Sequence, residues 1–171
     1  MESVLTAPVN YADAHMRAML AAQSQPLQVL PVAPDQALQR IAELEAMMLR
    51  CEQEEIPTEH LFHAGMYART LTVPPLMVVT GSLTKCPTTL IVSGTGYLLA
   101  GDALVEFDGY RVIAGSAGRK QVLVTRSEVK VTMIFSTKAK TVEEAEAEFT
   151  NEHDRLLSRK QDANTVVMTG E

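Results

Sequence analysis

The sequence predicts a mainly β protein, with a barrel or sandwich in the middle of the chain and helices on either side of it. Residues 60–137 contain short runs rich in Val, Ile, Leu and Thr, and all of these but Leu are typical strand formers. Glycine or proline interrupts these runs at short intervals, as at residues 74–75, 94–96, 101–102 and 108–109. Such spacing of strands and turns is typical of an all-β barrel or sandwich. We expect strands over residues 66–71, 76–80, 88–92, 97–99, 103–107, 111–114, 121–124 and 129–135.

Three segments are expected along the chain. Residues 1–57 should form an N-terminal arm with two helices and a proline-rich strap, residues 58–137 the β-barrel, and residues 138–171 a C-terminal helix with a flexible tail. In the arm, Asn10 is expected to cap a short helix over residues 11–23. The strap, residues 27–34 (LQVLPVAP), should be extended and excluded from the centre of a sheet, because three prolines lie within or beside it.

A stronger helix is expected over residues 36–54, with Asp35 as its cap. Ala37, Ile41, Leu44, Met48 and Cys51 follow a 4-3-4-3 spacing, which places one apolar stripe along the helix. This stripe either packs on the β-domain of the same chain or forms a seam with a helix of a second subunit. The sequence leaves both arrangements open, because the pattern is too short to establish a coiled coil.

The segment after the last expected strand begins with a capping box. Thr141 is followed three residues later by Glu144, which predicts a helix that runs to about residue 160. Acidic residues crowd its first half and basic residues its end, in keeping with the helix dipole. Residues 161–171 are expected to be a frayed tail.

Composition and charge narrow the function classes. The net charge of −6 among 171 residues argues against binding to nucleic acid or to an anionic membrane. The chain has no apolar run of membrane-spanning length and no secretory signal pattern, so we expect a soluble protein that is in the cytoplasm when it is made. Cys51 and Cys86 lie in regions of different predicted structure and are expected to be unpaired thiols.

Residues 60–69 (HLFHAGMYAR) resemble the first strand of small cupin-like proteins of tailed phages. In those proteins a His-Phe-x-x-Gly-x-Tyr-Ala-Arg run leads into a Gly-x-x-His-x-x-x-His segment. The turn at residues 114–120 (AGSAGRK) and the Thr-capped acidic helix after the last strand are similar as well. The resemblance covers about residues 60–150. It implies a cupin-like jelly roll, that is, a double-stranded β-helix.

The same resemblance implies that a metal site has been lost. Metal-binding cupins hold iron, manganese or zinc with histidines and a carboxylate inside the barrel. The two histidine positions of the first motif fall on Thr84 and Thr88, and a further one in the last strand falls on Phe135. The position of the second motif falls on Lys120 or Gln121, depending on the register of the loop. Hydroxyl, amide and phenyl groups are poor ligands for these ions, so we expect neither a metal nor another cofactor.

Few other residues carry a chemical signal. His60 and His63 should point to opposite faces of a strand, which excludes a shared metal ion. The glycine-rich segments 94–96 and 115–118 do not open a helix after a strand, as phosphate-binding loops do. We therefore assign no catalytic residue.

Three functions remain open, of which the first is favoured. It is a non-catalytic jelly-roll structural or accessory protein that decorates or assembles a phage particle. Its expected partners are further copies of itself, in a homo-oligomer, and other phage structural proteins. The virion is therefore a second expected location. The second is a cupin-type isomerase, epimerase or lyase for a small sugar or acid in the barrel. The third is a small-ligand sensor or an inhibitor of a host protein. Candidate polar residues for the enzyme are Tyr67, Arg69, Thr84, Thr88 and Lys120, and the expected subunit contacts are Leu27, Val29, Leu30, Val32, Ile41, Leu44 and Met48.

Overall fold

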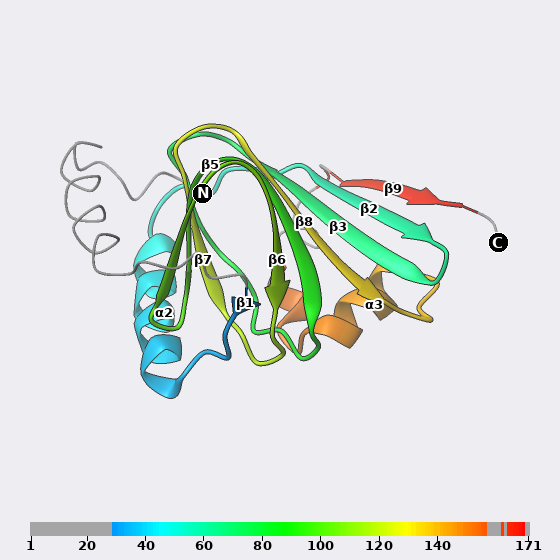
Figure 1. The fold of residues 1–171 in the computed structure, drawn as a ribbon, viewed down its shortest axis with the longest axis horizontal. Coiled ribbons are helices and arrows are strands. Elements are labelled where there is room, and N and C mark those ends of the chain that lie inside the picture. Colours follow the sequence, from blue (N-terminus) through cyan, green and yellow to red (C-terminus); the bar gives the residue numbers. More distant parts are fainter. Residues whose placement is uncertain (1–28, 157–161, 163, 170–171) are drawn as a thin grey trace.

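The computed structural model describes residues 29–156, 162 and 164–169 (Figure 1). The expected helix over residues 11–23 and the strap residue Leu27 lie outside these described residues. Three short helical elements accompany the strands: α2 (Asp35–Met48), α3 (Val142–Phe149) and the 3₁₀ turn η1 (His153–Arg155). The strands are β1 (Val29–Leu30), β2 (Thr58–His63), β3 (Met66–Val73), β4 (Val78–Thr80), β5 (Thr88–Ala100), β6 (Ala103–Gly115), β7 (Gln121–Thr125), β8 (Val129–Ser136) and β9 (Asn164–Met168).

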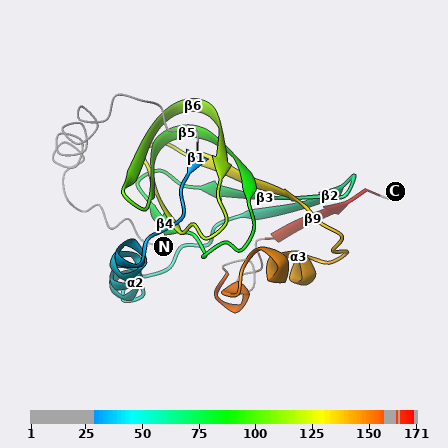
Figure 2. The same ribbon diagram turned by 60° about the horizontal axis from the view of Figure 1, so that its bottom comes forward.

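The strands form one sheet that rolls into a barrel. Its main order is β1-β6-β5-β8-β3-β2-β9, and β7 joins β5 on one side and β4 on the other. Strand β5 makes this roll, because its first half pairs with β8 and its second half with β7, while β6 follows it along its whole length. The long β5–β6 hairpin is therefore shared by both sides of the barrel (Figures 1 and 2). The predicted fold class, a mainly β cupin-like jelly roll with helices before and after it, is confirmed.

The hairpin corrects one part of the sequence prediction. Residues 88–92 and 97–99 were expected as separate strands, but both belong to β5; the same holds for the two halves of β6. The glycines between them permit a close approach and a bend. A Cβ atom on Gly94 would lie 2.4 Å from the carbonyl oxygen of Glu128, and one on Gly96 would lie 2.4 Å from that of Val124. The turn from β7 to β8 crosses here, at the point where β5 changes partner.

Two apolar clusters fill the interior. The larger cluster lies inside the barrel, with Val73, Leu90, Val92, Leu98 and Phe107 at its centre. The second lies between α3 and the sheet and contains Phe62, Tyr67, Phe135 and Phe149. Aromatic rings pack edge to face in this second cluster, with the Phe135 ring 5.5 Å from that of Tyr67 and 6.0 Å from that of Phe149. Phe135 thus serves as a core residue at the position where the resemblance places a histidine.

Helix α2 packs against the barrel and lies below β4 at the lower left of Figure 2. It begins at Asp35, with Pro34 in the N-cap position and no side-chain cap, and it ends at Met48. The predictions of an Asp35 cap and of an end near residue 54 were therefore wrong. Ile41 and Met48 are buried in the barrel cluster, and Leu44 packs against it. The stripe thus packs on the β-domain of its own chain, which is one of the two arrangements left open by the sequence.

The part of the strap that the structure describes begins as an extended strand, as predicted. Its residues Val29 and Leu30 form β1, a parallel edge strand beside β6. Leu30 is fully buried within the chain, whereas Val29 and Val32 are 48% and 60% exposed. Of the seven residues expected at subunit contacts, Leu30, Ile41 and Met48 are thus occupied inside this chain, and Val29 and Val32 are open to a partner.

The C-terminal region differs from the prediction in two places. Thr141 caps α3 as predicted, because its hydroxyl accepts a hydrogen bond from the Glu144 N–H; the Glu144 carboxylate accepts its bond from the Lys140 N–H, one residue before the cap. The helix ends at Phe149, however, and not near residue 160. Residues 164–168 of the expected tail form β9, which pairs in parallel with β2. Among the described residues, no helix has the length and apolar character needed to cross a bilayer.

Candidate functional site

The two threonines at the expected metal positions converge on a buried guanidinium group. Arg119 donates a hydrogen bond of 2.7 Å to the Thr88 hydroxyl and one of 3.3 Å to the Thr84 hydroxyl. It also donates to the Ser116 carbonyl at 3.1 Å and to the Gln121 side-chain oxygen at 3.2 Å. Arg119 is only 1% exposed. This interior site therefore holds a fixed cation of the protein itself.

Glycine makes room for this arginine. A Cβ atom on Gly115, at the end of β6, would lie 2.5 Å from the Arg119 guanidinium carbon. Gly118 takes a positive φ of 75°, which turns the chain back toward β7. Burial lowers the pKa of Arg119 to about 10, so the side chain stays charged at neutral pH. The glycines of this loop thus serve to accommodate the Arg119 side chain and the turn of the chain, a role that is unrelated to phosphate binding.

The residues at this position do not fit a transition metal. Iron, manganese and zinc require imidazole, thiolate or carboxylate ligands, and a permanent positive charge beside the ligand positions would repel the ion. In the part of the chain that the structure describes, no cluster of three or more His, Cys, Asp or Glu side chains has a geometry that could hold a metal ion.

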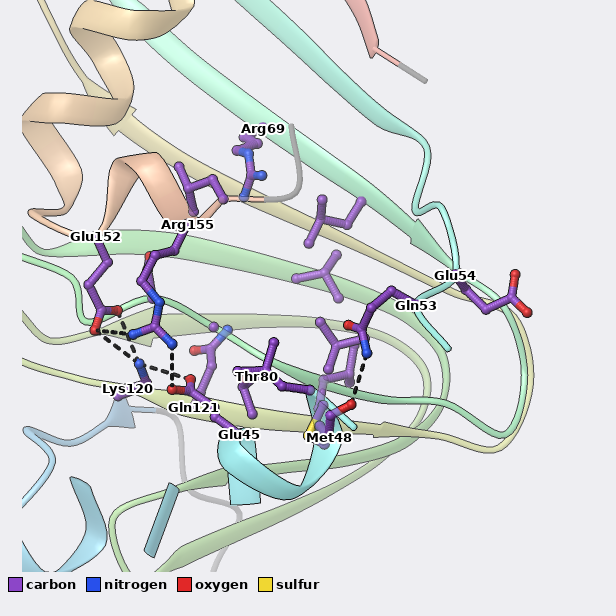
Figure 3. A pocket seen from close by; sticks show the side chains of 18 of the residues that line it. Glu45, Met48, Gln53, Glu54, Arg69, Thr80, Lys120, Gln121, Glu152 and Arg155 are labelled. Carbon is purple, nitrogen blue, oxygen red and sulfur yellow. Dashed lines mark hydrogen bonds and ion pairs between the residues drawn. The ribbon is translucent and has the colours of Figure 1, made fainter. Parts of the chain in front are cut away.

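A pocket of about 460 Å³ opens beside this site, between α2 and the barrel strands (Figure 3). Apolar side chains of the barrel, such as Leu71, Val79, Leu123 and Val131, line its wall. Its polar lining residues come from segments that are distant in the sequence: Glu45, Gln53, Glu54, Glu55, Arg69, Thr80, Ser82, Lys120, Gln121, Glu152 and Arg155. Thr84 and Thr88 are not among the residues that line it.

Four of these charged side chains form a network at the pocket wall. The Lys120 ammonium group lies 3.0 Å from the Glu45 carboxylate and 3.0 Å from that of Glu152. Arg155 lies 3.4 Å from Glu45 and 3.8 Å from Glu152 (Figure 3). The network joins α2, the start of β7 and the segment after α3. Each cation contacts both anions, so the charges of the network neutralise one another.

Burial and hydrogen bonding act in opposite directions on Glu152. Burial alone would raise the pKa of its carboxyl group. The hydrogen bond from the Leu83 N–H and the contact with Lys120 outweigh this effect and hold the pKa below its usual value of 4.5. The Glu152 carboxylate is therefore charged at neutral pH and is not placed to act as a general acid.

A second polar group lies under α3, beside the aromatic cluster. Nδ1 of His60 lies 2.7 Å from the Tyr67 hydroxyl oxygen, and Arg69 lies 4.0 Å from the fully buried Glu146. Burial and the nearby Arg69 lower the pKa of His60, so its ring is neutral at pH 7. Burial raises the pKa of Tyr67. As predicted, His60 and His63 point to opposite faces, with His60 buried and His63 exposed.

The structure separates the residues that were proposed for an enzyme. Thr84 and Thr88 contact Arg119, and Tyr67 lies in the aromatic cluster. Only Arg69 and Lys120 reach the pocket. Arg119 was not predicted as a site residue, although it lies in the loop directly before the candidate Lys120. Glu45, Glu152 and Arg155 were not predicted either, and for these the sequence offers no signal because they come together only through the fold.

Comparisons with known proteins identify similarity at the level of structure alone. No protein-family profile matches the chain, and no curated protein sequence does. A cupin-2 barrel-domain protein from Salinispora arenicola is similar over 51% of this chain and 81% of its own, with 14% identity and a TM-score of 0.40. The cupin domain of Cnp3 from Schizosaccharomyces pombe is similar over 50% of this chain and 67% of its own, with 12% identity and a TM-score of 0.42.

A larger enzyme also shows similarity. Salicylate 1,2-dioxygenase from Pseudoaminobacter salicylatoxidans is similar over 75% of this chain and 38% of its own, with 8% identity and a TM-score of 0.45. Such similarities concern the fold and assign no activity to this chain. The connections of the strands define the class of the protein, a cupin-like jelly roll.

Proposed function

We propose that this protein is a non-catalytic jelly-roll structural or accessory protein that acts as a homo-oligomer in the assembly or decoration of a phage particle. The observation that carries the non-catalytic part is the internal pairing of its interior charges. Arg119 is bound by Thr84 and Thr88, and Lys120 is bound by Glu45 and Glu152. A catalytic acid or base must be able to exchange a proton with a substrate. These groups instead tie one part of the fold to another.

The outer surface supports a role in association. Val29 and Val32 of the strap are large apolar side chains that are about half exposed or more. Apolar groups at a surface are available for contacts with partner proteins. The phage-particle part of the proposal has a different support, the sequence resemblance at residues 60–69.

The assembly role is tested by purification of the virion from the source of the gene. Quantitative mass spectrometry should detect this protein in a fixed copy number relative to the major capsid protein. Its absence from both mature and immature particles would contradict the particle role.

The homo-oligomer is tested in solution by light scattering. The wild-type protein should have a mass that is a multiple of the chain mass. Substitution of Ile41 and Met48 by Asp would not test this point, since both side chains are buried in the barrel core and their loss would unfold the protein. Val29→Asp with Val32→Asp is the suitable pair, because both side chains are exposed.

The pocket supports one alternative function, the binding of a small acid or sugar. Its volume of about 460 Å³ is within the range of ligand pockets, and Arg69 and Lys120 line it. A screen of small carboxylic acids and sugar nucleotides by thermal shift tests this alternative. A rise in the melting temperature that Lys120→Met abolishes would favour a ligand-binding or enzymatic role.

A further inference from the structure

The pocket beside α2 has an apolar wall that is built from both sides of the barrel. Leu71 of β3 lies beside Val131 of β8, and Val79 of β4 lies beside Leu123 of β7. All four side chains line the pocket, together with Met48 of α2. Strand β8 pairs with the first half of β5 and β7 with the second half, so the two pairs of side chains belong to different parts of the rolled sheet. The pocket volume of about 460 Å³ between them suits the apolar body of a small molecule.

The charges around the pocket argue against a charged ligand. In the network at the pocket wall, each of the two cations contacts both carboxylates. The other cation of the lining, Arg69, lies 4.0 Å from the fully buried Glu146. The other acidic residues of the lining, Glu54 and Glu55, are exposed to solvent. A charged ligand would compete with one of the ion pairs and leave a buried charge without its partner, which costs free energy. The pairing therefore favours an uncharged ligand.

Gln121 provides a directional contact at the apolar wall. It precedes Leu123 by two residues on β7, so both side chains lie on the same face of the strand. The side-chain oxygen of Gln121 accepts a hydrogen bond of 3.2 Å from Arg119, which assigns its amide nitrogen the role of a donor. Because Gln121 lines the pocket, this donor suits a hydroxyl or carbonyl oxygen of a ligand (Figure 3).

We propose that this pocket binds an uncharged small molecule with an apolar body and one hydroxyl or carbonyl oxygen, such as an aromatic alcohol. The body packs between the two pairs of apolar side chains, and the Gln121 amide donates a hydrogen bond to the oxygen atom. Ligand pockets commonly combine an apolar wall with a few polar groups that fix the orientation of the ligand. This inference goes beyond the proposed structural role, and its test is independent of the phage particle and of the oligomer.

The ligand class is tested by isothermal titration calorimetry of the full chain with three compounds that share one ring system. At pH 7, 2-naphthol is uncharged, 2-naphthoate is an anion and 2-naphthylmethylammonium is a cation. 2-Naphthol should bind at a single site per chain. Both ions should bind more weakly by about tenfold or more, because each competes with an existing ion pair. Absence of 2-naphthol binding, or binding of either ion with equal or higher affinity, would overturn the proposal.

A variant that fills the pocket tests the place of binding. Leu71→Trp adds bulk at the apolar wall and should abolish the binding of 2-naphthol. The matched control is Thr72→Trp, since Thr72 is the next residue of β3, lies on the opposite face and is not among the residues that line the pocket. This control should bind 2-naphthol as the wild type does. Circular dichroism checks the fold of both variants. Wild-type affinity in a folded Leu71→Trp variant would show that the site lies elsewhere.

A second variant tests the polar contact and serves also if Leu71→Trp does not fold. Gln121→Leu removes the amide donor and adds little bulk. The affinity for 2-naphthol should fall by a factor of about two to ten, which corresponds to one hydrogen bond. The affinity for 2-methylnaphthalene, which has no oxygen atom, should stay the same. An equal change for both compounds, or no change for 2-naphthol, would refute the contact with Gln121. The mass in solution is measured separately, so a failure here leaves the homo-oligomer standing.

Discussion

The hydrogen bond between Thr88 and the buried Arg119 gives a direct test of the interior site. Thr88→Val replaces the hydroxyl with a methyl group of nearly the same size, so the packing is kept while the 2.7 Å hydrogen bond is lost. A hydrogen bond to a charged group contributes about 1.5–3 kcal/mol to stability. With an m-value of about 2 kcal/mol per molar urea, the midpoint of unfolding should fall by about 1 M.

The matched control for this variant is Thr89→Val. Thr89 is the next residue of β5, and its side chain is exposed on the opposite face. Its substitution should change the free energy of unfolding by less than about 0.5 kcal/mol. A double-mutant cycle completes the test, because Thr88→Val should cost almost nothing in an Arg119→Met background. Equal losses for the two valine variants, or an unchanged loss without Arg119, would refute the role of this hydrogen bond.

Three further predictions follow from the charged and polar groups around the site. Lys120→Met should lower the free energy of unfolding by about 3 kcal/mol in urea titrations, since it leaves the carboxylates of Glu45 and Glu152 without their nearest cation; a loss below about 1 kcal/mol would contradict the network. Acidification should destabilise the protein in two steps. The first begins below pH 6.5, where the unfolded chain takes up a proton that the lowered pKa of His60 keeps off the folded state; the second begins near pH 4.5, where the unfolded chain protonates Glu152 while the lowered pKa keeps this carboxylate charged in the folded state. Glu152→Gln should remove only the second step from the pH profile of the urea midpoint. Tyr67→Phe should cost about 1 kcal/mol in the same assay through the lost contact with His60, and an NMR titration of the His60 ring checks whether that contact exists.

The fold class could be predicted from the sequence because the strand and turn signals are local. The two-residue turn between β5 and β6, at residues 101–102, is one of the glycine signals that mark a hairpin. The same signal was ambiguous at Gly94 and Gly96. The sequence alone does not show whether a glycine ends a strand or lets another segment cross a continuous strand. At Gly94 and Gly96 the position of the β7–β8 turn shows that the second case applies.

Strand β9 could not be predicted, for a related reason. Its three apolar residues follow a polar segment near the end of the chain, and this pattern resembles a tail. The strand exists through its pairing with β2, about a hundred residues earlier in the chain, and such pairing leaves no local pattern.

The candidate site was predicted in part. The resemblance located Thr84 and Thr88, and the alternation along the strand gave the opposite faces of His60 and His63. Arg119, which contacts both threonines, was missed. The sequence of a glycine-rich loop does not determine which of its side chains points into the barrel. A shift of one residue separates Lys120, which lines the pocket, from Arg119, which is buried behind it.

The shared β5–β6 hairpin has a consequence for the way this barrel folds and opens. The hairpin connects residues that are close in sequence, so it can form early, and β1, β7 and β8 then dock on a template that is already in place. Since β7 and β8 both pair with that template, we expect the two sides of the barrel to open together when the hairpin opens. Native-state hydrogen exchange should therefore report one common opening free energy for the amides of β7 and β8, although these strands lie on different halves of β5.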